Sequence, residues 1–292
     1  SSYIKKENIR IIHVSWTKDL LLSALVKLFS GNKISIIYHR QMKITRYKKD
    51  IYHNFIYKSI NMVLVITKAL SEDCKKFLPI DNDRIIKLSY GIALPDNKNT
   101  FDKKLLFDEI ELQENIFTIG VFSRIEEQKG QHLIIEALNI LHEKNIQLLI
   151  VGHCMDISYQ NDLRKMIEKY NMHDRVAFKP FIESPMKIMP MLDLIILPTY
   201  EETFGLVVAE SMLMGTPVIG SNAGGVPEII NDNNNGLLFE SRNSKSLSKK
   251  IISIYESEEL RIKLSNNAKI FASEEYNYEK HFSKLTTILQ KL

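Results

Sequence analysis

Residues 198–230, with the sequence PTYEETFGLVVAESMLMGTPVIGSNAGGVPEII, decide the interpretation of this chain. The stretch predicts a strand end, an acidic turn, a helix, a short buried strand, a glycine loop and the start of a second helix. The first helix, from about Phe204 to Met214, is apolar on nearly every face, which is typical of a buried helix. Glu210 lies in its middle, and a buried carboxylate is costly unless it is hydrogen-bonded or paired.

A second carboxylate stands just before the same helix. Glu202 lies where backbone N–H groups are unpaired and the helix dipole is positive, so this helix end favours anions. One acid is expected to be buried among apolar side chains and the other to lie beside an anion-binding helix end. Together, Glu202 and Glu210 predict a ligand site.

The segment ETFGLVVAE, from Glu202 to Glu210, and the segment GTPVIGSNAGGVPE at 215–228 together carry a family resemblance. They resemble the Glu-x7-Glu motif of retaining glycosyltransferases with the GT-B fold, and more narrowly the group 1 (family 4) enzymes. The resemblance implies an α/β fold in which two Rossmann-like domains face a cleft. It also implies that the first domain is incomplete here, because the family has an opening strand and a glycine-bearing loop upstream of the segment similar to IRIIHV at 9–14.

Length and composition indicate an ordinary globular protein of two modest domains. The chain has 292 residues, of which 45% are hydrophobic and 25% are charged, and it contains no apolar run of membrane-spanning length and no signal peptide. The two cysteines, Cys74 and Cys154, are far apart in sequence and lack metal-ligand spacing. They favour a reducing compartment, so we expect a cytoplasmic protein.

Strands alternate with helices along the chain, which indicates parallel, doubly wound sheets. We expect a partial acceptor-side domain over 1–92, a linker over 93–114 and a nucleotide-sugar-binding domain over 115–270. A basic helix is expected over about 46–60. By the family resemblance, the terminal segment 271–292 is a helix that crosses back to the first domain.

Positive charge is concentrated in the first third of the chain. Residues 1–92 contain 17 Lys/Arg and 7 Asp/Glu, a net charge of +10, whereas the remaining residues have a net charge of −6. The densest basic segment contains Arg40, Lys43, Arg46, Lys48 and Lys49. It is either a solvated face or a surface for a phosphorylated acceptor or an anionic membrane, which would make the protein peripheral on the inner membrane face. Nucleic acid is disfavoured, because no binding motif is present and the segment is interpreted as lacking interleaved aromatic side chains.

Two cations follow the predicted strand at 116–123. Lys129 precedes a helix, where a positive charge opposes the dipole unless an anion lies there. One interpretation is that Glu126 and Glu127 neutralise Arg124 and Lys129 in surface pairs. The resemblance implies another, in which both cations bind the diphosphate of the donor and stabilise its developing charge.

The resemblance implies roles for further residues. Glu210 would accept the ribose hydroxyl groups of the nucleotide, and Glu202 would hold hydroxyl groups of the transferred sugar; a core carboxylate and a helix cap are the alternatives. His39, at the end of a predicted strand, would reach the transferred sugar. The other predicted donor-binding residues are Phe204, Gly205, Leu206, Gly224 and Gly225. A tight strand–helix turn explains the glycine pair equally well.

The sequence therefore predicts a retaining glycosyltransferase that moves a sugar from a nucleotide-sugar to a glycan or lipid-linked acceptor in cell-surface polysaccharide biosynthesis. No metal ion or other cofactor is expected. Two alternatives are a GT-B nucleotide-sugar epimerase and a nucleotide-sugar-binding fragment without turnover. Release of a free sugar isomer would indicate the first, and nucleotide binding without transfer would indicate the second.

Overall fold

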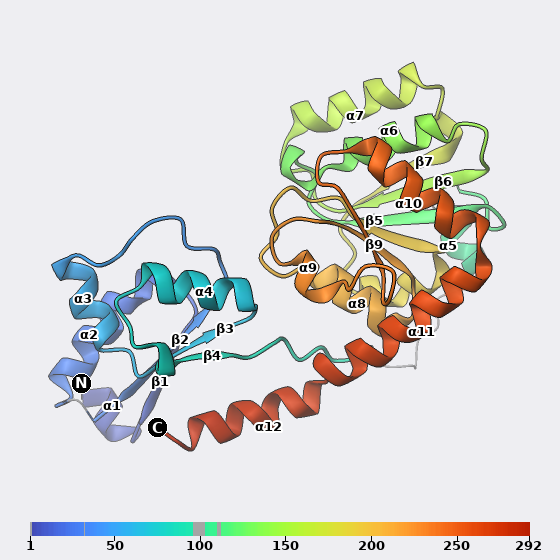
Figure 1. The fold of residues 1–292 in the computed structure, drawn as a ribbon. Coiled ribbons are helices and arrows are strands. Elements are labelled where there is room, and N and C mark those ends of the chain that lie inside the picture. The colour runs from blue at the N-terminus through green and yellow to red at the C-terminus, as the bar shows by residue number, and fades with distance from the viewer. Residues whose placement is uncertain (1, 32, 96–102, 110–111) are drawn as a thin grey trace. The chain divides into compact units, whose positions relative to one another are not determined.

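The computed structural model describes residues 2–31, 33–95, 103–109 and 112–292. The chain divides into two compact units (Figure 1). Unit 1 combines Ser1–Gly91 with Tyr276–Leu292, and unit 2 contains Ile92–Glu275. The linker predicted over 93–114 falls partly on residues 96–102 and 110–111, which lie outside the described residues.

Unit 1 is built on a parallel sheet with the strand order β1-β2-β3-β4. Its strands are β1 (Ile11–Val14), β2 (Ser35–Arg40), β3 (Met62–Val65) and β4 (Ile85–Lys87). Its helices are α1 (Ser2–Lys6), α2 (Leu20–Phe29), α3 (Ile51–Lys58), α4 (Lys68–Phe77) and α12 (Tyr278–Leu289). Neighbouring strands are joined through helices, as parallel pairing requires.

The basic helix predicted over about 46–60 is shorter than expected. The helix α3 begins only at Ile51, because the carboxylate of Asp50 accepts a hydrogen bond from the backbone N–H of His53 at 3.0 Å and caps the helix there. Residues 41–50 therefore form an irregular segment between β2 and α3. The basic side chains of this segment project from a loop and not from a helix face.

The terminal helix α12 completes the core of unit 1. Ile288 is 5% exposed and packs with buried residues of three strands or strand ends: Ile37, Leu64 and Leu88. Close approach of the helix depends on Gly91, where a Cβ atom would lie 2.6 Å from the Cβ atom of His281. A ring nitrogen of His281 is hydrogen-bonded to the carbonyl of Ser89 at 2.7 Å. The core of unit 1 thus needs residues from both ends of the chain.

Unit 2 contains a parallel sheet with the strand order β10-β9-β8-β5-β6-β7. The strands are β5 (Phe117–Phe122), β6 (Ile146–Val151), β7 (Val176–Lys179), β8 (Leu194–Leu197), β9 (Val218–Ser221) and β10 (Leu237–Phe239). The helices are α5 (Lys103–Glu109), α6 (Gln131–Ile140), α7 (Ile157–Lys169), α8 (Leu206–Met214), α9 (Val226–Ile229), α10 (Ser244–Glu256) and α11 (Glu258–Glu275). The chain runs outward from β5 to β7 and then returns to the other side of β5 at β8. The switch point of the sheet therefore lies between β5 and β8, where ligands of such sheets bind.

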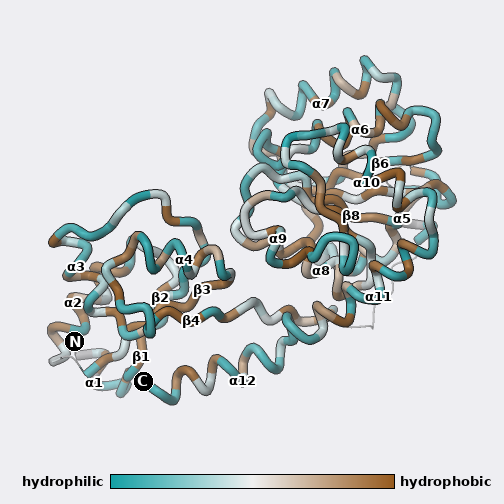
Figure 2. Tube along the Cα trace, in the orientation of Figure 1, coloured by the Kyte–Doolittle hydropathy of each residue, from teal (hydrophilic) through white to brown (hydrophobic). Residues whose placement is uncertain are grey.

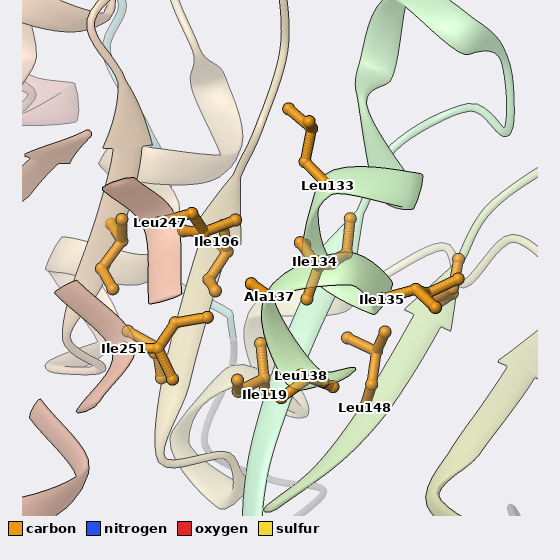
Figure 3. Packing of buried hydrophobic residues seen from close by; sticks show 14 of the residues in the cluster. Ile119, Leu133, Ile134, Ile135, Ala137, Leu138, Leu148, Ile196, Leu247 and Ile251 are labelled. Carbon is orange, nitrogen blue, oxygen red and sulfur yellow. The ribbon is translucent and has the colours of Figure 1, made fainter. Parts of the chain in front are cut away.

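Helices cover both faces of this sheet. Figure 1 shows α6, α7 and α10 on one face and α8 on the other. The first face holds a large cluster of aliphatic side chains, in which Ile134 and Leu138 of α6 lie between strand residues such as Ile119 and Leu148 (Figure 3). These side chains are fully buried, so the core fixes the strand ends that carry the loops of the candidate site.

The helix of the opening motif differs from its prediction in two ways. It begins at Leu206 and not near Phe204, because Gly205 adopts a φ of +97° and serves as the N-cap. Leu206 is 44% exposed and Val207 is half-buried, so the helix is not buried on every face. Glu210 lies on this less buried side and is itself half-buried, whereas the sequence predicted a carboxylate buried among apolar side chains.

We predict that Ile288→Ala destabilises unit 1 by about 2–4 kcal/mol, because it opens a cavity between α12 and the sheet. Urea unfolding followed by circular dichroism measures the loss. Ile270→Ala is the matched control, since Ile270 lies on α11 and is 63% exposed; its effect should stay within about 0.5 kcal/mol. Equal losses in the two variants would contradict the packing described here.

Candidate functional site

An ion pair joins the two loops that leave the switch point of unit 2. The ammonium of Lys129, beyond the end of β5, lies 2.9 Å from Oε2 of Glu202, beyond the end of β8. The two side chains are only 15% and 23% exposed, so solvent screens this pair less than a surface pair. Lys129 was expected to need an anion at this helix end, and Glu202 supplies it. Among the described ion pairs, none joins Lys129 to Glu127.

Glycines allow the loops around this ion pair to pack backbone against backbone. A Cβ atom on Gly130 would lie 2.3 Å from the carbonyl oxygen of Pro198, and one on Gly224 would lie 2.1 Å from that of Glu202. The N–H of Gly225 donates to the same Glu202 carbonyl at 2.7 Å. Gly224 and Gly225 thus hold the backbone at Glu202 in place. This is the structural role, in a tight turn, that the sequence analysis gave as the alternative to ligand binding. Their contact with a donor stays a prediction.

The carboxylate of Glu210 lies half-buried in the middle of α8. No hydrogen bond or ion pair to this side chain is found in the part of the chain that the structure describes. Burial raises the pKa of Glu210 to about 7, and no neighbouring charge opposes this shift. A group with hydroxyl donors would supply the hydrogen bonds that this carboxylate lacks.

The beginning of α8 offers backbone donors beside Glu202. Its N-cap, Gly205, has no side chain that could accept a hydrogen bond from the first turn. Glu202 is held close by, because its Oε1 atom accepts a hydrogen bond from the N–H of Thr203 at 3.1 Å. Phe204 itself is 5% exposed and packs in the core. This helix end can therefore receive an anion through the N–H groups that follow Gly205.

Arg124 projects into solvent from the loop after β5. Its side chain is 57% exposed, and its guanidinium pairs with Glu126 at 2.9 Å, which is the ion pair considered as an alternative. Main-chain geometry at Arg124 is fixed by the buried amide of Gln131, which donates to the Arg124 carbonyl at 2.8 Å. An open hollow of about 870 Å³ lies beside these residues, between Arg124 and the loop that reaches Ser158. An anion entering this hollow would meet the Arg124 side chain.

A smaller hollow of about 290 Å³ lies past the ends of β6 and β7. Its lining includes His153 and Pro180, and the His153 ring stacks on Phe181 with ring centres 5.0 Å apart. Phe181 is 58% exposed, so an outer aromatic surface is available there. Sequence analysis missed this pair, since a lone His and a lone Phe in separate loops give no local signal.

Sequence analysis also missed a polar chain behind the ion pair. The hydroxyl of Tyr159 accepts a hydrogen bond from the backbone N–H of His132 at 3.1 Å and is also hydrogen-bonded to Nδ1 of that ring at 2.8 Å. Nε2 of His132 is hydrogen-bonded to the hydroxyl of Tyr200 at 2.6 Å. Burial lowers the pKa of His132, which agrees with a neutral ring. Tyr200 precedes the acidic turn, and Arg242 covers its ring at 4.3 Å.

His39 lies in unit 1, at the end of β2. Its ring is half-buried and stacks on His13 with centres 5.6 Å apart. Burial lowers the pKa of His39 to about 4, and nearby His13 and His281 add to the shift, so the ring is neutral near pH 7. Its Nε2 atom is buried without a hydrogen-bond partner among the described residues. A polar group of a ligand would satisfy that atom, and the predicted role of His39 is untested.

One Asp-x-Asp tripeptide, a spacing that could hold a metal ion, occurs at Asp81–Asp83 in unit 1. There Asp81 forms an ion pair with Arg84 at 3.0 Å. No group of three or more His, Cys, Asp or Glu side chains suited to a metal ion is found within the described ranges. Metal independence of the reaction stays a prediction.

We predict that Glu210→Gln stabilises the ligand-free protein at pH 8 but not at pH 5. The folded-state pKa of about 7 lies above the usual glutamate value, so stability from this group is present below about pH 4.3 and is lost as pH rises through 7. The gain should reach up to about 3 kcal/mol at pH 8, measured by urea unfolding. Glu274→Gln, an exposed position on α11, is the control and should show no such pH dependence. A gain of equal size at both pH values would contradict a strained carboxylate.

Comparison with known proteins identifies the family. The sequence profile described as "Glycosyl transferases group 1" matches residues 102–271. The chain is 25% identical to the N-acetyl-alpha-D-glucosaminyl L-malate synthase of Bacillus anthracis over 97% of this chain and 75% of that protein. It is 28% identical to an uncharacterized glycosyltransferase of Methanocaldococcus jannaschii, and there the match covers 79% of this chain but only 60% of that protein.

A solved structure gives the same answer for the fold. Anabaena HepE in complex with UDP and glucose aligns with a TM-score of 0.85, covering 97% of this chain and 78% of that one at 22% identity. At this identity the likeness concerns the fold, and it confirms the predicted α/β GT-B architecture. Since the family profile also covers more than half of the sequence, the chain belongs to the group 1 glycosyl transferases.

Proposed function

We propose that the protein transfers a glycosyl group from a nucleotide-sugar to a glycan or lipid-linked acceptor, with retention of configuration. The observation that carries this proposal is the arrangement at the switch point of unit 2. There a half-buried Lys129–Glu202 pair lies at the ends of two strands, and the uncapped helix end at Gly205 and the half-buried carboxylate of Glu210 follow Glu202 in the chain. Each of the three lacks or can exchange a partner that a nucleotide-sugar would supply.

The diphosphate is assigned to the positive groups of this site. Lys129 would hold a phosphate oxygen while keeping its contact with Glu202, since an ammonium has three donors. The N–H groups at the start of α8 and the guanidinium of Arg124 would add further donors. Arg124 must give up its pair with Glu126. The Arg124 side chain of this pair is 57% exposed, and surface pairs contribute about 0–1 kcal/mol.

The nucleoside is assigned to Glu210 and to the aromatic pair. Ribose hydroxyl groups would donate to the Glu210 carboxylate and stabilise its ionised form. The base would lie against the smaller hollow, which His153 lines, and beside the Phe181 ring that stacks on His153. The UDP and glucose bound to HepE support a nucleotide-sugar of this kind.

Transfer would proceed on one face of the sugar. Glu202 would hold the sugar hydroxyl groups through the oxygen atoms that Lys129 orients, and the acceptor would attack from the side on which the diphosphate leaves. Lys129, Arg124 and the helix N–H groups would stabilise the charge that develops on the leaving group. His39, neutral and with a free Nε2 atom, is assigned to the transferred sugar. A sugar passed to a lipid-linked acceptor in polysaccharide synthesis would place this reaction at the inner face of a membrane.

A donor screen tests the proposal directly. Thermal unfolding with UDP, GDP, ADP and CDP identifies the base, because a ligand at a hundred times its Kd adds about 2.7 kcal/mol. Incubation with the matching nucleotide-sugars then follows release of the nucleoside diphosphate and the fate of the sugar. Release that depends on an added glycan or lipid-linked acceptor supports transfer. A free sugar isomer indicates an epimerase, and binding without release indicates a fragment without turnover.

We predict that binding of the best nucleoside diphosphate strengthens as pH rises from 6 to 8, since the ribose hydroxyl groups bind the ionised form of Glu210. Glu210→Gln should weaken binding at pH 8 by about 1.5–3 kcal/mol and remove the pH dependence. Isothermal titration calorimetry in buffers of different ionisation enthalpy measures both the affinity and the released proton. Glu274→Gln is the control, and an unchanged affinity in Glu210→Gln would exclude the ribose assignment.

We predict that Arg124→Ala and Lys129→Ala weaken binding of the nucleoside diphosphate at least tenfold more than binding of the nucleoside. The reason is that both cations are assigned to phosphate oxygens, so their contribution grows with ligand charge and weakens with salt. Lys249→Ala, an exposed position on α10, is the control. Equal losses for nucleoside and nucleoside diphosphate would show that these cations act only through protein ion pairs.

A further inference from the structure

Unit 1 exposes apolar side chains at the place where its positive charge is concentrated. Ile51 and Tyr52, at the start of α3, are 91% and 54% exposed, and Phe55, one turn further along, is 45% exposed. Ile51, Phe55 and Lys58 share the outer face of this helix, while Ile56 and Tyr57 on the other face are buried. Figure 2 shows both hydrophobic and hydrophilic stretches along α3 and the segment that leads into it.

The loop before α3 adds cations with an aromatic ring among them. Tyr47 is 62% exposed, and the ammonium of Lys49 lies 5.9 Å from the centre of its ring. The interpretation that this segment lacks interleaved aromatic side chains is therefore wrong. The exposed members of the loop and helix, here named the basic–aromatic surface, are Met42, Lys43, Arg46, Tyr47, Lys49, Ile51, Tyr52, Phe55 and Lys58.

Three cations of this surface have no carboxylate partner among the residues that the structure describes. Arg46, Lys49 and Lys58 form no ion pair with a carboxylate of the described residues. The nearest acid in sequence, Asp50, is occupied as the cap of α3, because its carboxylate binds the N–H and the ring of His53. The neighbouring Lys48 has its pKa lowered by burial and by the charges of Arg40 and Arg46, so the cations of the loop repel one another.

The packing of the loop places it against a second basic element. The N–H of Lys48 donates to the carbonyl of Phe77 at 2.9 Å, and the rings of Tyr47 and Phe77 meet edge to face at 5.0 Å. The ammonium of Lys76, exposed near the end of α4, lies 5.0 Å from the Phe77 ring. The surface is thus a fixed part of unit 1 and extends onto the end of α4.

We propose that the basic–aromatic surface binds the surface of an anionic phospholipid bilayer. Cations attract acidic headgroups, and exposed aromatic and aliphatic side chains enter the boundary between headgroups and acyl chains. A soluble phosphate would need the cations but not Ile51, whose side chain is almost fully exposed. A nucleic acid would stack on the tyrosines but has no use for an aliphatic helix face. Among the helices of the described residues, none combines the length and hydrophobicity that a bilayer crossing requires.

The proposed function includes a lipid-linked acceptor, and this inference would bring the protein to the bilayer that contains such an acceptor. Its test requires no transferase activity. The full chain is sedimented with vesicles of phosphatidylcholine alone and with an equal mixture of phosphatidylcholine and phosphatidylglycerol. We expect binding only to the anionic vesicles, with weakening at high salt because exposed charges are screened. Equal binding to both vesicle types, or binding to neither, would overturn the proposal.

Two multiple variants separate the charged and apolar contributions. Arg46→Gln/Lys49→Gln/Lys58→Gln and Ile51→Ser/Phe55→Ser should each reduce the partition coefficient at least tenfold. The controls are Lys245→Gln/Lys249→Gln/Lys263→Gln, at exposed lysines of unit 2, and Ile262→Ser/Ile270→Ser, at exposed isoleucines of α11. Circular dichroism confirms that each variant is folded. Losses of the same size in the controls would overturn the assignment to this surface.

A direct measurement of insertion completes the test. The chain has one tryptophan, Trp16, so the pair Trp16→Phe and Ile51→Trp moves the fluorophore to the proposed contact. Anionic vesicles should shift its emission to shorter wavelength, and brominated lipid should quench it. Emission that is unchanged on vesicle binding would overturn the insertion of α3. Release from vesicles by soluble glycerol phosphate, or preferential binding to single-stranded DNA, would indicate a different ligand and overturn the proposal.

Discussion

The candidate site depends on the pairing of Lys129 with Glu202 across the switch point of the unit 2 sheet. One partner follows β5 and the other follows β8, so the pair connects the two halves of a parallel sheet. From this point, successive strands are added on opposite sides. The pair is held in place by contacts that contain no charge. Gly130 packs on the backbone of Pro198, and Gly224 packs on the backbone of Glu202. The positions of Lys129 and Glu202 therefore depend on two neighbouring residues that have no side chain.

The two acids of the opening motif have different environments although they lie on the same short stretch. Glu202 has a cation and a backbone N–H as partners, so its charge is satisfied within the chain. Glu210 has neither, and burial raises its pKa to about 7. A ligand that donates hydrogen bonds would stabilise the ionised Glu210 carboxylate. Glu202 already has Lys129 as a partner and would share it with the ligand. This difference agrees with separate roles and not with an acid and nucleophile acting together.

Much of the fold and part of the site could be predicted from the sequence, for reasons that differ between residues. The Glu-x7-Glu spacing and the glycine-rich turn lie within 30 residues, so local pattern was enough to place the fold and both acids. The start of α3 was missed, since the capping bond of Asp50 outweighed a basic run that favoured a longer helix. The Tyr159–His132–Tyr200 chain and the His153–Phe181 stack come from loops far apart in sequence. Only the folded sheet brings such residues together, and single-sequence patterns contain no information on their distance.

The place of α12 has a consequence for the order in which the protein is made. Ile288 belongs to the core that Ile37, Leu64 and Leu88 form, and these partners leave the ribosome long before it does. Unit 2 lies between them in sequence and has all its strands synthesised before α12 is complete. During translation, unit 2 can therefore fold as soon as its last helix emerges. Until α12 is made, the apolar side chains of unit 1 that pack on Ile288 stay uncovered. A nascent chain stalled before α12 would present those side chains to chaperones, although most of unit 1 has already been translated.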